Sequence, residues 1–338
     1  MSTTADAATR TAGAAMRIVI TDCDHDSLAV EQRVADEAGA ELVLAPPGGR
    51  EQLVAAAAGA DGLVVQYARV DAALLDALPG VRAVGRYGVG VDTVDVAACT
   101  ERGVAVCNVP DYGTESVSDH AIALALAAAR RIAWMDRGVR AGTAGLDAVR
   151  PVHQVGGRVF GVVGLGLIGA ATARKAAGLG YEVIGADSRL EPGSTVAGVR
   201  VVPLEELLRR AHVISLHVPL TESTRGLVGA AELALVRPDA VLVNTSRGGV
   251  VDSAALVDAL REGRLHGAGL DVHEVEPLPV DHPLAALDTV VLTPHLAWYS
   301  EESYGELKRR TVQNVVDVLA GRRPRDVLNP EVLDGGRR

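Results

Sequence analysis

Short apolar runs alternate with longer segments of mixed polarity along almost the whole chain. Such runs predict buried strands of a parallel sheet, and the segments between them predict helices that cover both faces of the sheet. A first block of expected strands comprises residues 17–21, 41–44, 62–66, 81–85 and 104–109, and a second comprises 158–163, 181–186, 213–217, 241–244, 267–272 and 290–293. The pattern therefore predicts an α/β protein with two doubly wound parallel-sheet domains.

Two helices determine how the chain divides into domains. Residues 116–130 have a capping-box-like start and lead from the first block into the second. The helix at 301–319 follows a sheet that is already complete, so we assign it to the first domain. The predicted division is a disordered tail at 1–15, a discontinuous domain at 16–115 and 299–338, and an inserted domain at 116–298. Ligands of such sheets bind outside the carboxyl ends of the strands, so we expect the chemistry in the cleft between the domains.

A glycine motif, Val-Gly-Leu-Gly-Leu-Ile-Gly at 163–169, follows an apolar run and opens an alanine-rich helix. Its glycines permit a tight turn close to a pyrophosphate, and the helix N-terminus offers N–H groups to it. Asp187 ends the next apolar run, where this fingerprint places an acid that accepts hydrogen bonds from the adenosine ribose. The inserted domain is therefore predicted to be a Rossmann domain. We expect NAD rather than NADP, because Asp187 would repel a 2′-phosphate unless Arg189 neutralised it.

Composition narrows the class of protein. The net charge of −10 and the pI of about 5.4 argue against a nucleic-acid partner or a membrane surface, since both need a concentrated basic face. The three cysteines lack C-x-x-C spacing, which favours a reducing, cytoplasmic compartment and no disulfide framework. No His, Cys and carboxylate cluster has zinc-site spacing, so no metal is predicted.

Three residues at predicted strand ends suit an acid substrate. Arg247 can present a guanidinium fork to a carboxylate, and His295 titrates near neutrality and can exchange a proton with a carbonyl oxygen. Glu276 would favour the protonated histidine and fix its orientation. Alone, each has a simpler interpretation, as a surface ion pair, a strand-end hydrogen bonder or a solvated turn residue. Their convergence on one edge favours a catalytic site.

These motifs resemble those of the D-isomer-specific 2-hydroxyacid dehydrogenases. The similar segments are Gly-Leu-Gly-Leu-Ile-Gly at 164–169, His-Val-Pro-Leu-Thr at 217–221, Val-Asn-Thr-Ser-Arg-Gly-Gly at 243–249, Leu-Asp-Val-His-Glu-Val-Glu-Pro at 270–277 and Gly-Val-Gly-Val-Asp at 88–92. The resemblance implies an NAD-dependent 2-oxo acid reductase whose nicotinamide exchanges hydride with C2 of a 2-oxo or 2-hydroxy acid. It implies that the first domain is a flavodoxin-like substrate domain. It also implies that His295 is the acid/base, that Glu276 hydrogen-bonds to His295, and that Arg247 binds the substrate.

The resemblance also assigns the binding residues. It places the NAD contacts at Gly164, Gly166, Leu167, Ile168, Gly169, Asp187, His217, Val218, Pro219, Thr224, Thr245, Ser246, Arg247, Asp271 and His295. It places the substrate contacts at Tyr67, Tyr87, Gly88, Val89, Gly90, Arg247 and Trp298. For Asp271, a local turn cap is an equally good interpretation.

Residues 293–301 narrow the comparison, because Thr-Pro-His-Leu-Ala-Trp-Tyr-Ser-Glu is similar to the C-terminal binding protein branch of the family. That branch raises an alternative function, an NAD(H)-sensing, corepressor-like dimeric binding protein. A phosphite dehydrogenase-like oxidoreductase is a second alternative. We favour the 2-oxo acid reductase because every catalytic position is occupied.

Aromatic placement and the long helix give two further expectations. Five of the few aromatic residues lie near strand ends or domain crossings: Tyr67, Tyr87, Tyr112, Trp298 and Tyr299. Trp298 also resembles the tryptophan that packs on the substrate side chain in the C-terminal binding protein branch. We therefore predict 2-oxo acids with an apolar, thioether or aromatic side chain rather than glyoxylate or pyruvate. The family resemblance implies a homodimer, and the apolar helix at 118–132 and an arm at 138–157 without an element of its own agree with it.

Overall fold

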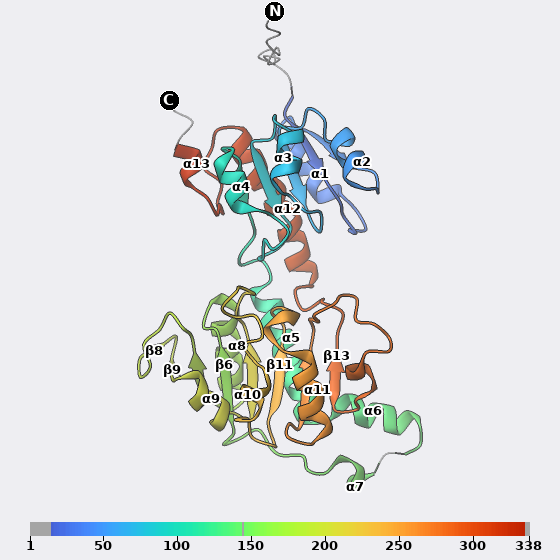
Figure 1. Ribbon diagram of the computed structural model, residues 1–338, viewed down its shortest axis with the longest axis vertical. Coiled ribbons are helices and arrows are strands. Elements are labelled where there is room, and N and C mark those ends of the chain that lie inside the picture. Colours follow the sequence, from blue (N-terminus) through green and yellow to red (C-terminus); the bar gives the residue numbers. More distant parts are fainter. Residues whose placement is uncertain (1–14, 144, 335–338) are drawn as a thin grey trace, which may run out of the picture. The chain divides into compact units, whose positions relative to one another are not determined.

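The computed structural model describes residues 15–143 and 145–334 and has two compact units. One unit comprises the residues up to Tyr112 and those from Glu301 onward, and the other is Gly113–Ser300. Each unit is an α/β structure built on a parallel sheet, so the predicted fold class is confirmed (Figure 1). Residues 1–14, most of the predicted tail, lie outside the described residues.

The first unit has a five-stranded parallel sheet in the order β2-β1-β3-β4-β5. Its strands are β1 Arg17–Ile20, β2 Glu41–Leu44, β3 Gly62–Val65, β4 Ala83–Arg86 and β5 Ala105–Cys107. Its helices are α1 Ala29–Glu37, α2 Arg50–Ala56, α3 Ala72–Ala77, α4 Val96–Glu101, α12 Glu301–Leu319 and α13 Glu331–Asp334. Four of the strands are nearly or fully buried, which matches their continuous apolar runs.

Helix α12 packs closely on the first sheet because two glycines leave room for it. A Cβ at Gly62 would lie 2.6 Å from the Val315 side chain, and a Cβ at Gly85 would lie 2.7 Å from the same side chain. The helix contacts β3, β4, β5 and α1. Helix α12 thus completes the core of the unit that contains the N-terminal strands.

The second unit has an eight-stranded sheet in the order β13-β12-β11-β10-β6-β7-β9-β8, parallel except for β8. Its strands are β6 Val159–Val163, β7 Glu182–Ala186, β8 Thr195–Val196, β9 Val199–Val201, β10 Val213–Leu216, β11 Val241–Asn244, β12 Gly267–Leu270 and β13 Val290–Leu292. The short hairpin of β8 and β9 was not predicted, because two- and three-residue strands leave too little pattern to detect.

Helices cover both faces of the second sheet (Figure 1). Helices α5 Thr114–Ala129 and α8 Leu167–Gly178 pack on one face, and α9 Leu204–Arg210, α10 Ala230–Leu233 and α11 Ser253–Arg261 pack on the other. Two single helical turns lie in the loops of this unit: η1 Gly248–Val250 follows β11, and η2 Pro283–Ala286 precedes β13. The described part of the chain contains no helix that is long and apolar enough to span a membrane.

Three sequence predictions about the linking region are wrong. Helix α5 begins at Thr114 without a side-chain cap, and Ser118 instead donates back to the Thr114 carbonyl oxygen at 2.7 Å. The helix also ends before Arg131, whose φ of 53° breaks it, so residues 118–132 are not one helix. Residues 138–157 do contain helical structure, in α6 Ile132–Arg140 and α7 Leu146–Val149.

Candidate functional site

The carboxyl ends of five neighbouring strands in the second unit are in register. The paired final positions are Val163, Leu216, Asn244, Leu270 and Leu292. The chain leaves β6 toward β7 on one side and returns through β10 on the other, so the switch point of this sheet lies between β6 and β10. Ligands of open α/β sheets bind at such a point. The glycine motif and the predicted catalytic residues all follow strands at this edge.

The glycine motif forms a turn that fits a dinucleotide. Gly164 has a φ of 92°, and a Cβ there would lie 2.7 Å from the His217 carbonyl oxygen. Gly169 packs on the Gly164 carbonyl, where a Cβ would clash. At Gly166, the N-cap of α8, a Cβ would meet no atom within 4 Å, and no side chain caps the helix. Open space beside uncapped helical N–H groups is the arrangement that receives a pyrophosphate.

Asp187 follows β7, at the position where the motif predicts an acid that binds the adenosine ribose. Its Oδ2 accepts the Leu165 N–H at 3.0 Å, so the acid also fixes the glycine turn. The Arg189 guanidinium pairs with both carboxylate oxygens, at 3.0 and 2.8 Å. This pairing lowers the pKa of Asp187 further than its burial raises it, so the group is ionised. Arg189 therefore pairs with Asp187, the residue that was predicted to exclude NADP.

His295 and Glu276 form a close polar pair at this edge. The Nδ1 of His295 lies 2.6 Å from Oε2 of Glu276, and the two side chains are 40% and 34% exposed. The other oxygen, Oε1, accepts the His273 N–H at 2.9 Å. Burial raises the pKa of Glu276, but the hydrogen bonds from His295 and His273 lower it further, so the net shift is downward. A carboxylate on Nδ1 leaves Nε2 of His295 available to a ligand.

Asp271 shapes the loop that carries the histidine. This carboxyl is fully buried, and its two oxygens accept the N–H groups of Leu296 and Ala297 at 3.1 and 2.9 Å. Its backbone oxygen accepts the His295 N–H at 2.7 Å, and His295 has a φ of 57°. Asp271 thus occupies the alternative role of a turn cap. The contact with the nicotinamide stays a prediction.

The loop after β11 positions Arg247. Asn244, the last residue of β11, donates from Nδ2 to the Arg247 carbonyl oxygen at 2.9 Å and accepts the Ser246 N–H at 3.0 Å. One Arg247 guanidinium nitrogen donates to the Ser246 carbonyl oxygen at 2.8 Å. Sequence reasoning missed Asn244 as a loop-forming residue, although a buried asparagine at a strand end is a detectable signal.

The other predicted cofactor residues of the second unit also lie in loops at the carboxyl edge. His217 follows β10, its Nε2 lies 2.8 Å from Ser215 Oγ, and desolvation lowers its pKa to about 4. Thr224 donates to the Pro219 carbonyl oxygen at 2.5 Å and so closes the loop that begins at Val218. Leu167 is 58% exposed at the start of α8. Ile168 is half-buried in the same turn, and Thr245 is buried after β11.

In the first unit, the turn at 87–90 follows β4. The carbonyl oxygens of Gly88 and Val89 are held by Val109 N–H at 2.9 Å and by Asn108 Nδ2 at 2.7 Å. Among the described residues, none accepts a hydrogen bond from the N–H groups of Gly88, Val89 and Gly90. We call these three groups the nest, because successive backbone N–H groups without an acceptor of their own can receive an anion. The contact of residues 88–90 with the substrate stays a prediction.

The aromatic residues predicted to contact substrate are placed differently from one another. The side chain of Tyr87 turns into the interior, where the residue is 3% exposed and its hydroxyl donates to Glu31. Tyr67 is 62% exposed, and its hydroxyl donates to Asp24 at 2.9 Å. Trp298 is half-buried and donates from Nε1 to the His295 carbonyl oxygen at 3.0 Å. Of the three, Tyr87 is placed as an anchor rather than as a ligand contact.

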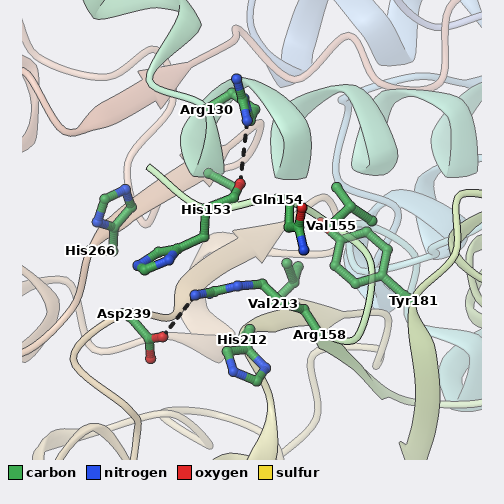
Figure 2. Close-up of a pocket in the computed structure, with 11 residues that line it drawn as sticks. Arg130, His153, Gln154, Val155, Arg158, Tyr181, His212, Val213, Asp239 and His266 are labelled. Atoms are coloured by element: carbon green, nitrogen blue, oxygen red, sulfur yellow. Dashed lines mark hydrogen bonds and ion pairs between the residues drawn. The ribbon is translucent and has the colours of Figure 1, made fainter. Parts of the chain in front are cut away.

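A pocket lies at the opposite, amino edge of the sheet of the second unit (Figure 2). Its polar lining consists of Arg130, His153, Gln154, Arg158, His212, Asp239 and His266. None of the residues predicted to bind NAD or substrate lies there.

Comparisons with known proteins agree with this geometry. Residues 122–297 match the family model of the D-isomer specific 2-hydroxyacid dehydrogenase, NAD binding domain. The chain is 45% identical to a glyoxylate reductase of Korarchaeum cryptofilum over 269 residues, which cover 78% of this chain and 81% of the relative.

Solved structures give the same result across nearly the whole chain. A glyoxylate reductase from Paecilomyes thermophila superposes with a TM-score of 0.85 at 27% identity, covering 94% of this chain and 99% of that one. An acyclic imino acid reductase, Bsp5, in complex with NADPH and D-Arg superposes with a TM-score of 0.84 at 27% identity, covering 93% and 100%. The predicted likeness to the C-terminal binding protein branch stays a prediction. The chain belongs to the D-isomer specific 2-hydroxyacid dehydrogenase family, an oxidoreductase family, and its second unit is the NAD-binding domain.

Proposed function

We propose that this protein reduces a 2-oxo acid to a D-2-hydroxy acid with NADH, and that His295 is the acid/base. The observation that carries the proposal is the 2.6 Å contact between His295 Nδ1 and Glu276. A carboxylate in this position stabilises the protonated imidazole and fixes its orientation, so the proton sits on Nε2 for delivery to a carbonyl oxygen. NAD, when bound, supplies the hydride in reduction and accepts it in oxidation.

Two further groups of this chain suit the substrate. The Arg247 guanidinium matches the planar carboxylate and carbonyl of a 2-oxo acid, and it stabilises negative charge that develops on the carbonyl oxygen. The nest of N–H groups at 88–90 suits the carboxylate. Each group, taken by itself, favours a substrate that carries a carboxylate.

The first test is a substrate panel assayed by NADH oxidation. Purified protein should reduce several 2-oxo acids and should leave phosphite unoxidised when NAD is supplied instead. Phosphite-dependent reduction of NAD without activity on any 2-oxo acid would overturn the proposal in favour of the phosphite dehydrogenase-like alternative.

We also propose that the substrate carries an apolar, thioether or aromatic side chain. Trp298 and Tyr299 pack edge to face, with ring centroids 5.7 Å apart, and Tyr299 is 47% exposed, so the loop after His295 offers aromatic surface. The names of the relatives favour glyoxylate as a second candidate. Steady-state kinetics separates the two, since higher kcat/KM for glyoxylate than for phenylpyruvate, or an unchanged ranking in Trp298→Ala, would reject the aromatic pocket.

A homodimer completes the proposal. Helix α6 has no buried residue, and Ile132, Val139 and Leu146 are 51%, 69% and 65% exposed. Apolar side chains clustered on one protruding segment suit a second copy of the chain. Sedimentation at micromolar concentration should give the mass of two chains, and a monomer would reject this part of the proposal. The cytoplasmic location stays a prediction.

A further inference from the structure

A group of buried and half-buried polar side chains lies next to the turn at 87–90, inside the first unit. This group, the Glu31 cluster, consists of His25, Glu31, Tyr87, Tyr304 and Lys308. The side chains of Glu31, His25 and Lys308 are only 0%, 2% and 4% exposed. Buried charges cost desolvation energy that their pairing rarely exceeds, so their presence points to a purpose other than stability.

Glu31 is the centre of the cluster. Its Oε1 accepts the Tyr87 hydroxyl at 3.1 Å and lies 3.1 Å from Nδ1 of His25. Lys308 Nζ, from helix α12, lies 3.6 Å from the other oxygen of Glu31 and offsets its charge. Burial, together with the charge of Glu31, raises the pKa of Tyr87 well above its usual value, so the phenol keeps the proton that it donates.

The ring of Tyr87 is held as firmly as its hydroxyl. It packs edge to face on the imidazole of His25, with centroids 4.6 Å apart. The backbone N–H of Tyr87 donates to the Val65 carbonyl oxygen at 2.9 Å. Tyr87 is therefore held at its backbone, at its ring and at its hydroxyl.

Tyr87 is also the residue from which the nest starts. Gly88 follows with a φ of 132°, a backbone conformation that only glycine adopts readily, and the N–H groups without acceptors begin there. The direction in which these groups point depends on where the preceding residue is held. A fixed Tyr87 therefore orients the nest before a ligand arrives, which removes an ordering cost from binding.

We propose that Glu31 is a positioning residue for substrate binding: it holds Tyr87, and through Tyr87 it orients the N–H groups of residues 88–90. This inference rests on the proposed role of that turn in binding the substrate carboxylate. Loss of the Glu31–Tyr87 hydrogen bond leaves the turn free to sample other orientations. This loss of order weakens substrate binding and leaves proton transfer at His295 unchanged.

The test compares Tyr87→Phe and Glu31→Gln with the control Tyr304→Phe. The Tyr304 hydroxyl donates to Asp26 rather than to Glu31, so the control removes a phenol from the same cluster without releasing the turn. We expect KM for the 2-oxo acid to rise about five- to ten-fold in the first two variants, with kcat changed less than about two-fold. KM in the control should stay at the wild-type value.

A second measurement does not depend on activity. Amide hydrogen exchange in residues 87–91 should be faster in Tyr87→Phe than in wild type and unchanged in Tyr304→Phe. Equal KM changes in all three variants, or unchanged exchange in Tyr87→Phe, would overturn the inference. Wild-type protein that reduces no 2-oxo acid would contradict the proposed function, and the exchange data would still decide whether Glu31 fixes the turn.

Discussion

His295, at the carboxyl edge of the second sheet, and the histidines at its amino edge have opposite electrostatic surroundings. At the carboxyl edge, the Glu276 carboxylate lies 2.6 Å from His295. At the amino edge, Figure 2 shows the side chains of His153, His212 and His266 around Arg158, whose partner is Asp239. Burial and neighbouring arginines lower the pKa of His266 to about 4 and also lower that of His212.

The charge of the neighbour decides what each histidine can do. His212 accepts the Val159 N–H at its Nδ1, at 3.0 Å, and Arg131 Nε donates to Nε2 of His266 at 3.4 Å. Both rings therefore act as neutral acceptors that support the fold. In contrast to these two rings, His295 has a carboxylate on one ring nitrogen, which suits a role in proton transfer.

The sharpest way to break this comparison is to remove one histidine from each edge. His295→Ala should lower kcat by about 10² to 10⁴, because it removes the proton donor, while NADH affinity stays near wild type. His266→Gln is the matched control and should keep wild-type turnover. Steady-state kinetics and NADH fluorescence titration measure both, and substantial turnover in His295→Ala would show that the acid/base has been misassigned.

Glu276→Gln tests whether the carboxylate is what distinguishes His295. Without the carboxylate the imidazole loses the group that orients it, so kcat in the reduction direction should fall about ten-fold. The loss should be smaller than in His295→Ala, because the histidine remains. Steady-state kinetics measures kcat, and an unchanged kcat would mean that Glu276 only supports the loop.

Asp187, a carboxylate paired with an arginine, tests cofactor choice, and we expect a smaller effect than that of the His295 and Glu276 variants on turnover. NADH should be preferred over NADPH by about ten-fold or more, since the Asp187 carboxylate opposes a 2′-phosphate. Asp187→Ala should narrow the gap by freeing Arg189, and Arg189→Ala should widen it. The ratio of kcat/KM values for the two cofactors measures this, and equal efficiency in wild type would refute the role of Asp187.

The smallest expected effect is on stability at mildly acidic pH. His266 has a lowered pKa in the folded protein, so the unfolded chain binds a proton more readily as the pH falls below about 6.5. Its contribution to stability is complete above that pH and is lost progressively toward pH 4. Tm should fall by a few degrees between pH 7.5 and 5, and less in His266→Gln. Parallel losses in both proteins would exclude this histidine as the cause.

The sequence was sufficient to predict the elements that have a clear apolar pattern, together with the residues that directly follow those elements. The strand ends, the glycine turn, and the Arg247 and His295 loops follow from such runs, and α12 spans the predicted residues 301–319. Interactions between distant residues left no such pattern. Glu31 and Tyr87 are 56 positions apart, and nothing near either residue indicates that their side chains meet. Arg189 lies only two positions from Asp187, but its pairing with that carboxylate depends on one side-chain conformation, which the sequence does not specify.

The most direct test of the central claim is the stereochemistry of the product. The protein, supplied with NADH and phenylpyruvate, should release phenyllactate that chiral chromatography identifies as the D isomer, with one NADH oxidised for each molecule formed. L-phenyllactate, or no NADH oxidation with any 2-oxo acid, would contradict the account.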